Sequence, residues 1–580
     1  MGLGVHLSQV NPEGAKSGRD ASKLITSLEN RKYSPESKED LRQAYVYDDK
    51  TFRGMNRLGC LKCGGYHKTR LHHDLMRTSI LVACALISFT WTAVAQTASP
   101  AGLTTNAQPV EQWGVFEQAF PGPSDGNPFV DVQLSAVFQQ GDSSVKVTGF
   151  YDGAGTYRIR FMPDKQGTWS FQTSSNKPEL DGKTGSFTAV APSPGNHGPV
   201  HVQNTYHFAY ADGTPYWEIG TTCYAWINQG DELAEQTLQT LQTAPFNKLR
   251  MCVFPKYMVY NHKEPVYYPY EGTPLMAWDY TRFNPVYFQN LEKRVGQLRD
   301  LGIEADIILF HPYDYNHWGF DRMGAENDDR YVRYVTARLS AYRNVWWSLS
   351  NEFDFVTSKK VADWDRLGNL VESSDPYGHL RSIHNARAPY DASKSWITHV
   401  SLQSHNMTFA ADLRKKYGKP VIYDECQYEG NIPQSWGKLT PEQMVQRFWQ
   451  ATVEGAYCGH GETYKDPNDI LWWAKGGVLH GQSPERIAFL KKILDDAPAE
   501  GLEPLIDAHT AGKAGEYYLT YVEDQPTSYQ LDLPSGVNFK AEVIDTWNMT
   551  ITPMDGELSG SVEIPLPGKP FQAIRLVHVP

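Results

Sequence analysis

Cysteine is scarce in this sequence, and basic residues form no block. The 580 residues include 7 cysteines, too few for a fold held together by disulfides. The net charge is −12, and without a basic block we exclude nucleic acid as the main partner. Internal repeats and low-complexity tracts are missing as well. Because 41% of the residues are hydrophobic and 13% aromatic, the chain is neither a disordered tail nor a coiled coil, and its length predicts roughly two to four globular domains.

An apolar run inside the chain has the features of a secretory signal peptide. Met76 and Arg77 begin a short positive region, residues 80–94 are mostly apolar, and residues 93–95 form a small-x-small cleavage site. The run is too short to span a bilayer comfortably. Because a signal peptide acts at an N-terminus, we expect translation to start at Met76, with residues 1–75 an upstream, non-native extension and residues 76–95 the signal peptide. The mature protein would be secreted or periplasmic in a bacterium, with no stable membrane anchor. The alternative is a cytosolic extension followed by a membrane anchor.

The upstream segment contains a motif that superficially resembles a zinc site. Cys60 and Cys63 are spaced as a metal-binding pair, and His67, His72 and His73 follow. A second clean pair at the usual spacing is missing. We therefore predict no metal site and no cofactor.

Three regions with different hydrophobic patterns follow. Residues 96–195 and 503–580 contain short alternating runs separated by turn residues, typical of β-sandwiches. Residues 200–500 instead alternate eight strand-like apolar runs with segments of helical period. The prediction is an α/β protein: a (β/α)8 TIM barrel flanked by N-terminal and C-terminal β-sandwich domains, with its site at the carboxyl ends of the strands. An open doubly wound sheet is the alternative, but no glycine-rich phosphate turn follows the first strand.

Two of the predicted barrel strands end in a glutamate. Glu352 closes the fourth strand and Glu425 the seventh, so the two face each other across the predicted mouth. Since side chains alternate along a strand, Ser350 would point inward with Glu352, and Tyr423 with Glu425. Two carboxyl groups about 5–5.5 Å apart can divide the work of retaining glycoside hydrolysis, one as the acid and the other as the nucleophile.

The sequence around these glutamates resembles a known clan. Ser-Leu-Ser-Asn-Glu at 348–352 and Tyr-Asp-Glu at 423–425 are similar to the retaining glycoside hydrolase barrels of clan A. Motifs beyond the strands narrow the resemblance to secreted proteins built from the domains DUF5060, DUF4038 and DUF5605, relatives of apiosidase-type hydrolases. These motifs cover residues 424–431, 459–464, 471–477 and 544–547, and the resemblance extends over about residues 108–580.

The resemblance implies roles for individual residues. Glu352 matches the acid/base and Glu425 the nucleophile, and both need no metal or cofactor. Asn351 matches the residue that hydrogen-bonds the sugar 2-hydroxyl, and Arg250 the cation that supports the nucleophile. Two histidines also match: His311 a sugar-contacting residue, and His405, loosely, a side chain that touches the nucleophile. The aromatic residue expected near the eighth strand is Tyr464, Trp472 or Trp473.

Other residues near the predicted mouth keep two interpretations. Trp226, Trp318 and Trp436 lie in strand-to-helix loops, where a ring either stacks on a sugar or packs within the loop. Glu462 follows the eighth strand and either binds substrate or is a buried, hydrogen-bonded carboxylate. His384 ends the fifth strand, as a sugar contact or as a core histidine. Two acidic residues replace the pair if the strand ends are misplaced by a few residues: Glu429 and Asp354.

The leading hypothesis is a secreted retaining glycoside hydrolase that cleaves a plant or microbial polysaccharide or oligosaccharide by double displacement. The alternative from another class is a non-catalytic carbohydrate- or matrix-binding surface protein. A metal-dependent hydrolase on the same fold would need clustered His or Asp ligands at the strand ends. The histidine candidates for such a cluster are His311, His384 and His405. The predicted partner is a carbohydrate, and the sequence predicts neither the sugar, its anomeric configuration, endo or exo action, nor an oligomeric state.

Overall fold

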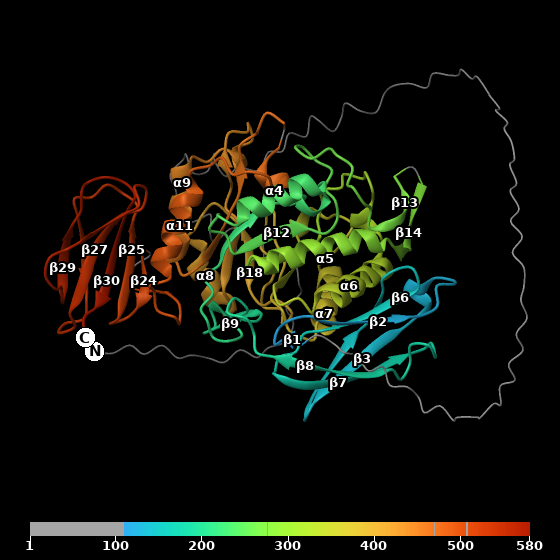
Figure 1. Ribbon diagram of the computed structural model, residues 1–580. Helices are drawn as coiled ribbons and strands as arrows, with labels where there is room; N and C mark the ends of the chain where they lie inside the picture. The colour runs from blue at the N-terminus through green and yellow to red at the C-terminus, as the bar shows by residue number, and fades with distance from the viewer. Residues whose placement is uncertain (1–108, 275, 469, 506–508) are drawn as a thin grey trace, which may run out of the picture. The chain divides into compact units, whose positions relative to one another are not determined.

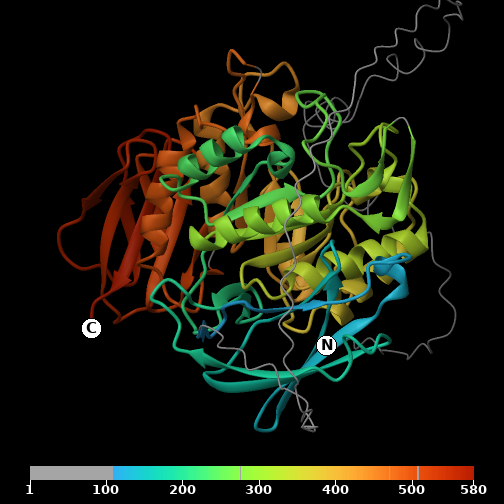
Figure 2. The same ribbon diagram turned by 45° about the vertical axis from the view of Figure 1, so that its right-hand side comes forward.

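The computed structural model describes residues 109–580 except residues 275, 469 and 506–508. The expected upstream extension, the signal peptide and the Cys60 and Cys63 motif lie outside the described residues. A central α/β region is flanked by two β regions, one on either side of it along the chain (Figures 1 and 2). In the part of the chain that is described, no helix has the length and apolar character needed to cross a bilayer.

The central region is built on eight strands that pair only in parallel. In chain order they are β11 (Ile219–Thr222), β12 (Lys248–Cys252), β15 (Glu304–Phe310), β16 (Val345–Ser350), β17 (Arg381–Ser382), β18 (Val400–Gln403), β19 (Val421–Glu425) and β21 (Tyr457–His460). Their order in the sheet is β17-β16-β15-β12-β11-β21-β19-β18. A single parallel bridge between His384 and Ser401 joins the two edge strands. This nearly closed barrel confirms the predicted TIM-barrel architecture.

Helices follow most of these strands and cover the outside of the barrel (Figure 1). Between β17 and β18 the described chain runs through turns instead. Local signals set the helix ends: the capping box of Thr440 and Gln443 starts one helix, and Gly418, with a φ of 61°, ends another. The helices are α4 (Asp231–Leu241), α5 (Pro285–Asp300), α6 (Ala325–Leu339), α7 (Val361–Ser374), α8 (Phe409–Tyr417), α9 (Pro441–Val453) and α11 (Ser483–Leu494).

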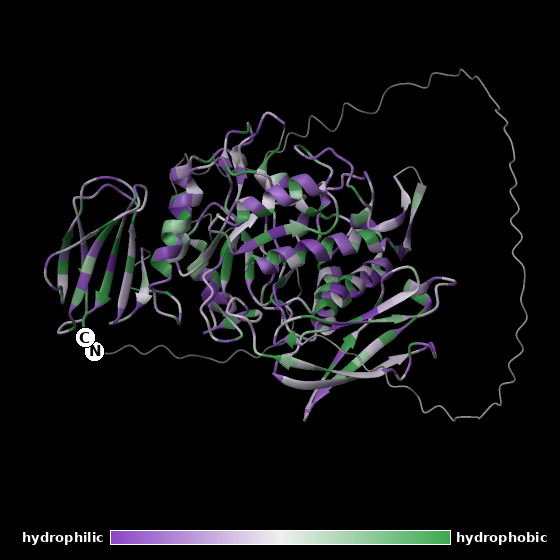
Figure 3. Ribbon diagram, in the orientation of Figure 1, coloured by the Kyte–Doolittle hydropathy of each residue, from purple (hydrophilic) through white to green (hydrophobic). Residues whose placement is uncertain are grey.

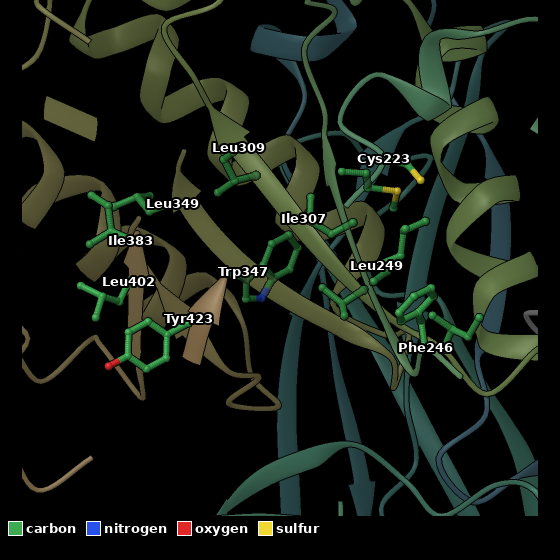
Figure 4. Packing of buried hydrophobic residues seen from close by; sticks show 14 of the residues in the cluster. Cys223, Phe246, Leu249, Ile307, Leu309, Trp347, Leu349, Ile383, Leu402 and Tyr423 are labelled. Atoms are coloured by element: carbon green, nitrogen blue, oxygen red, sulfur yellow. The ribbon is translucent and has the colours of Figure 1, made fainter. Parts of the chain in front are cut away.

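The barrel strands alternate between an apolar outer face and a polar inner face. Leu249, Ile307 and Trp347 pack outward against the helices in one large core (Figure 4). Along α5 and α6, hydrophilic and hydrophobic residues alternate as expected for helices with one buried face (Figure 3). On the inner face of β12, Lys248 and Arg250 make ion pairs with acidic residues of other strands. The barrel interior is therefore charged, whereas the layer between strands and helices is apolar.

On β19 the observed side-chain directions differ from the predicted ones. Tyr423 packs in the outer layer and its hydroxyl donates to the Met407 carbonyl at 2.7 Å, so the prediction that it points inward with Glu425 is wrong. Asp424 occupies the inward position instead and pairs with Lys248. The pairing of β18 with β19 shifts register just before Glu425, and this irregularity breaks the alternation at the last residue of the strand.

A β-hairpin closes the amino-terminal end of the barrel. It consists of β9 (Val200–Gln203) and β10 (His207–Tyr210), which pair antiparallel. Phe208 of this hairpin packs with Trp346 and Ile422, which come from the inner faces of β16 and β19. This apolar cluster fills the amino-terminal end of the barrel, so the site residues lie at the opposite, carboxyl-terminal end.

The N-terminal β region has two sheets that share one core. The five-stranded sheet has the order β1-β8-β7-β3-β4 and the three-stranded sheet the order β2-β6-β5. Phe116 from one sheet stacks on Phe187 from the other. Its elements are β1 (Val110–Glu111), β2 (Phe116–Pro121), α3 (Pro128–Asp131), β3 (Leu134–Gln140), β4 (Ser143–Thr148), β5 (Phe150–Tyr151), β6 (Thr156–Phe161), β7 (Gly167–Ser175) and β8 (Thr184–Val190).

The C-terminal β region also has two sheets around a core of its own. The larger sheet has the order β23-β24-β25-β30-β27-β28, and β26 pairs with β29. Tyr521 stacks on Trp449 of α9, which fixes this region against the barrel. The strands are β23 (Glu503–Pro504), β24 (Thr510–Lys513), β25 (Tyr517–Val522), β26 (Ser528–Asp532), β27 (Phe539–Asp545), β28 (Thr550–Pro553), β29 (Ser561–Pro565) and β30 (Gln572–His578).

The strand-to-helix loops contain short strands and short helices. Two of them, β20 and β22, pair in parallel, and β13 and β14 form a hairpin after β12. They are η2 (Trp226–Asn228), β13 (Tyr270–Thr273), β14 (Met276–Phe283), η3 (Phe320–Arg322), η4 (Phe353–Phe355), β20 (Glu429–Gly430), η5 (Ser435–Gly437), β22 (Glu462–Thr463) and α10 (Trp472–Lys475).

Candidate active site

Glu352 and Glu425 are joined by a short chain of hydrogen bonds. The Tyr313 hydroxyl donates to Glu352 Oε2 at 2.6 Å and accepts from Asn351 Nδ2 at 2.8 Å. The same Asn351 nitrogen donates to Glu425 Oε1 at 3.1 Å. Three hydrogen bonds therefore connect the two carboxyl groups, and they lie in one site at the carboxyl ends of β16 and β19.

The backbone at Glu352 adopts a conformation that is uncommon for a residue with a side chain. Its φ is 43° and its ψ 55°, in the left-handed region, which costs about 1–2 kcal/mol for residues other than glycine. Directly before it, the amide of Asn351 still pairs with the Phe310 carbonyl at 3.0 Å as part of the sheet. The chain thus leaves the strand abruptly at Glu352, and such strain is typically kept where function requires a side chain in one place.

Glu425 is surrounded by donors and positive charge. Its Oε1 accepts from the Tyr224 hydroxyl and lies 3.4 Å from His384 Nε2 and 3.9 Å from Arg250 Nη1. Burial alone would raise the pKa of Glu425, but hydrogen bonding and charge from His384, followed by the charge of Arg250, outweigh it and hold the pKa below its ordinary value. Glu425 is therefore ionised at neutral pH.

His384 links Ser401 and Asp424 to Glu425. The Ser401 hydroxyl donates its only hydrogen to Asp424, and His384 Nδ1 lies 3.0 Å from the same Ser401 oxygen. Nδ1 must then be the donor, since Ser401 has no second hydrogen. Nε2 of His384 lies 3.4 Å from Glu425 Oε1, so Ser401 and Asp424 orient the imidazole ring toward the Glu425 carboxylate.

Glu352 lies in the opposite electrostatic environment. Burial raises its pKa, and the negative charge of Glu425 raises it further, well above the ordinary value for a glutamate. The hydrogen bond from Tyr313 and the charge of Lys256 oppose this rise only in part. Gln403, with its amide nitrogen turned toward Glu352, donates to Oε1 at 3.2 Å. Glu352 is therefore the proton carrier of the pair.

A buried ionic network below the site fixes Arg250. Its Nε donates to Asp306 at 3.1 Å, and its Nη2 donates to Asn351 Oδ1 at 3.0 Å. Lys248, one layer deeper, pairs with Asp424 at 2.8 Å and with Glu218 at 2.9 Å. Since breaking a buried pair leaves an uncompensated charge, this network holds the cation of the site rigidly.

Asn351 and Arg250 thus lie beside Glu425, whereas His311 is held by the backbone. Both ring nitrogens of His311 are bound by backbone: Nε2 lies 3.0 Å from the Phe254 carbonyl, and Nδ1 accepts from the Tyr313 amide at 3.1 Å. Burial lowers the pKa of His311 to about 3, so the ring is neutral. His405 is exposed, and the histidine that contacts Glu425 is His384. His405 was matched loosely through the resemblance, whereas His384 had been expected at the end of the fifth strand as a sugar contact or a core histidine.

The predicted tryptophans divide into buried and site-facing rings. Trp226, Trp318 and Trp472 are at most 5% exposed. Their indole nitrogens are also occupied, donating to the Ala234 carbonyl, to Glu264 and to Thr221 respectively. These three rings are placed as packing residues rather than as platforms for a sugar.

Trp436 and Trp473, in contrast, belong to the aromatic cluster around the site. Their ring centroids are 4.9 Å apart, and Trp473 also contacts the rings of Tyr224 and Tyr428. Of the three aromatic candidates near the eighth strand, Trp473 is the one that contacts the ring of Tyr224, whose hydroxyl donates to Glu425.

The other acidic residues near the mouth tether loops. Glu462 accepts from the amides of His480 and Gly481 at 2.6 and 2.8 Å. Glu429 accepts from the Gln482 amide at 2.9 Å, and Asp354 from the Ala386 amide at 2.6 Å. Of the two interpretations of Glu462, the structure thus shows the buried, hydrogen-bonded carboxylate, and neither Glu429 nor Asp354 lies in the pair.

Sequence reasoning missed three residues that complete the site: Tyr224, Lys256 and Tyr313. Each lies two to four residues beyond the carboxyl end of a barrel strand, β11, β12 and β15 respectively. That position was a usable signal, because the strand-to-helix loops at this end of a TIM barrel build its site. Among the described residues, no group of three or more His, Cys, Asp or Glu is arranged to hold a metal ion.

Comparisons with known families match the chain over three consecutive segments. Residues 109–176 match a domain of unknown function, DUF5060, residues 202–494 the apiosidase-like catalytic domain, and residues 506–577 a second domain of unknown function, DUF5605. The order of the three matches confirms the resemblance seen in the sequence. No curated protein matches the chain.

Solved structures extend this similarity to the whole fold. A protein of Bacteroides vulgatus, provisionally named a glycoside hydrolase, is 41% identical with a TM-score of 0.79, and the match covers 82% of this chain and 100% of the other. A family 5 glycoside hydrolase of the same organism is 16% identical with a TM-score of 0.54, covering 67% of this chain and 95% of the other. The second match shows the barrel fold alone.

Proposed function

Because this chain belongs to the apiosidase-like family of catalytic domains, we propose that it is a retaining glycoside hydrolase that acts on a plant or microbial polysaccharide or oligosaccharide. The observation that carries the proposal is the pair Glu352 and Glu425, which one hydrogen-bond chain connects while their pKa values shift in opposite directions. Glycosidic bond cleavage needs one protonated and one ionised carboxyl group at the same bond.

In the first half-reaction Glu352 is the general acid and Glu425 the nucleophile. Tyr224, His384 and Arg250 all contact the same oxygen of Glu425, Oε1, which leaves Oε2 to attack the anomeric carbon. As the new C–O bond forms, the bond to the leaving oxygen breaks and that oxygen takes the Glu352 proton. The products are the free alcohol and a glycosyl ester on Glu425, and the negative charge of the pair now lies on Glu352.

In the second half-reaction water replaces the enzyme at the anomeric carbon. Glu352, now a carboxylate, takes a proton from the water as its oxygen attacks, and the electrons of the ester bond return to Glu425. Because each half-reaction inverts the anomeric carbon, the product keeps the configuration of the substrate. Asn351 holds Glu425 in the attack position, and a sugar 2-hydroxyl would reach it by replacing one of its two present acceptors.

The direct test is a screen of purified protein against aryl glycosides and polysaccharides, with the configuration of the first product followed by NMR. Retention of configuration together with loss of turnover in Glu425→Ala is the expected result. Inversion would reassign Glu425 as a base that activates water. Tight saccharide binding without turnover of any glycan would favour the non-catalytic binding protein instead.

We further propose that the enzyme is exported by the signal peptide that starts at Met76. We assign the flanking β regions, residues 96–195 and 503–580, as β-sandwich domains beside the barrel of residues 200–500. Support comes from the two sheets with a shared core that each region contains. In the N-terminal region, Arg160 also donates to Glu292 of α5 at 2.9 Å, which makes this domain a brace for the barrel.

A further inference from the structure

Lys256 is a buried cation without a hydrogen-bond acceptor. It follows β12 by four residues and is 2% exposed. Within the described part of the chain, its ammonium group has no hydrogen-bond partner. It lies instead among aromatic rings, 3.9 Å from the ring centre of Tyr224, 3.9 Å from that of Tyr313 and 5.0 Å from that of Trp473. An unpaired buried charge is costly, and cation–π contacts offset only part of that cost.

The two nearest rings belong to the tyrosines that contact the two glutamates. The Tyr224 hydroxyl donates to Glu425, and the Tyr313 hydroxyl donates to Glu352. The negative charges of both glutamates act on Lys256, that of Glu425 more strongly than that of Glu352. Lys256 therefore lies between the two carboxyl groups electrostatically, without a direct contact to either.

Double displacement moves one negative charge from one glutamate to the other. Before the attack the charge lies on Glu425 and Glu352 carries the proton, whereas in the glycosyl-enzyme Glu425 is a neutral ester and Glu352 must be ionised. We propose that Lys256 is the positioning residue that balances this charge in both half-reactions, so that Glu352 loses its proton once Glu425 is esterified. This inference rests on the proposed retaining function.

The other cationic groups near the two glutamates act on Glu425. The charges of His384 and Arg250 act on Glu425, whereas Lys256 is the cation whose charge lowers the pKa of Glu352. The groups that face Lys256 are Cys252 and Arg250 from β12, together with both glutamates. Glu352 is faced by Glu425, Tyr313, Lys256 and Gln403. The neutral His311 stacks on Tyr313 and contributes no charge.

The test uses Lys256→Met, which keeps the volume and removes the charge. A dinitrophenyl glycoside of the sugar that the wild-type enzyme hydrolyses makes the second half-reaction rate-limiting, as a burst of dinitrophenolate verifies. Without the cation the ionised form of Glu352 in the glycosyl-enzyme is less stable, so its pKa rises. We expect the acid limb of the kcat profile to move to higher pH by roughly one unit, as expected for a charge removed at intermediate distance in a protein.

Rescue by azide distinguishes loss of the Lys256 charge from a merely structural effect of the substitution. Azide attacks the glycosyl-enzyme without base assistance, so it should restore kcat of Lys256→Met below the shifted limb and yield the glycosyl azide. Lys256→Arg should keep the wild-type limb because it keeps the charge. The matched control is Lys263→Met, an exposed lysine of the same loop, which should change nothing.

Stability separates this role from a structural one. Replacing an unpaired buried charge by an apolar side chain of similar volume is neutral or stabilising, so the Tm of Lys256→Met should not fall. Should this variant fail to fold, Lys256→Gln takes its place with the same expected shift. An unchanged acid limb with a raised KM would show that Lys256 binds sugar and would overturn the proposal. Inversion of configuration by the wild-type enzyme would instead refute the retaining function itself, independently of Lys256.

Discussion

The carboxyl ends of β16 and β19 present the same residue type in opposite environments. At the end of β19, Glu425 meets His384, an arginine and a tyrosine hydroxyl, and its pKa falls. Just beyond the end of β16, burial and the charge of Glu425 raise the pKa of Glu352, and the charge of Lys256 opposes this rise only in part. Both glutamates lie at the carboxyl end of a barrel strand, Glu352 two residues beyond β16 and Glu425 as the last residue of β19, and the difference between their pKa values comes from the neighbouring strands and loops.

The largest effect is expected at the ionised member of the pair. Glu425→Ala removes the nucleophile, and kcat/KM should fall on the order of 10⁴-fold or more, as when a nucleophile is removed from other enzymes that work through a covalent intermediate. Steady-state kinetics on an aryl glycoside measures the loss. External azide should restore part of the rate and give a product of inverted configuration. A variant with wild-type activity would show that the environment of Glu425 serves structure only.

Glu352→Gln removes the proton carrier and leaves the nucleophile in place. Turnover of a glycoside with a poor leaving group should fall by about 10²–10⁴-fold, the usual contribution of general acid catalysis. A dinitrophenyl glycoside, which needs no protonation, should form the glycosyl-enzyme at nearly the wild-type rate.

The same variant tests the raised pKa of Glu352. In the wild-type enzyme Glu352 must be protonated, so deprotonation at high pH produces the alkaline limb of the kcat/KM profile, at a pH above the ordinary range of a glutamate. This limb should be absent in Glu352→Gln. Its persistence at the same pH would assign the limb to another group.

His384→Gln tests what makes the two strand ends different. The substitution removes the side chain that contributes most to lowering the pKa of Glu425, so that pKa rises. Glu425 must be ionised, and the acid limb of kcat/KM should therefore move to higher pH, with a loss of about 10–100-fold at neutral pH from one charged hydrogen bond. Lys248 and Asp424 remain as in the wild type. An unmoved limb would mean that Arg250 alone keeps Glu425 ionised.

The smallest effect on catalysis is expected at Glu462, an acidic residue near the same end of the barrel. Glu462→Gln replaces one of two oxygens that bind backbone amides, so one buried donor loses its acceptor. The free energy of unfolding should fall by about 1–3 kcal/mol, measured by denaturant titration, while kcat/KM stays within a few-fold. A loss comparable to that of Glu352→Gln would place Glu462 in the chemistry.

Local patterns in the sequence predicted the parts of the fold that depend on local forces. One of the segments of helical period in the central region forms α5, Pro285–Asp300, because periodic apolar residues and the cap at Asn284 act within a few turns. The two strand-end glutamates followed from the repeat of the barrel. The direction of the Tyr423 side chain was predicted wrongly because it depends on the register shift in the pairing of β18 with β19. The spacing of residues within β19 alone does not show that shift.

The site shows the same division. Asn351 and Arg250 were identified through the family resemblance, which follows the order of residues along the chain. That His384 contacts Glu425 emerged only from the closed barrel, which brings the end of β17 beside β18. Trp226 and Trp472 were expected near the mouth from their loops, and packing buried both.

The sequence by itself determined the strand and helix repeat, the family and the identity of the two glutamates, since these depend on residue order along the chain. The resemblance implied which glutamate is the acid and which is the nucleophile, but only the tertiary structure supplied the physical reason why their pKa values differ. A carboxyl group responds to burial, donors and charges within a few ångströms, and here those neighbours come from strands that lie far apart in the chain.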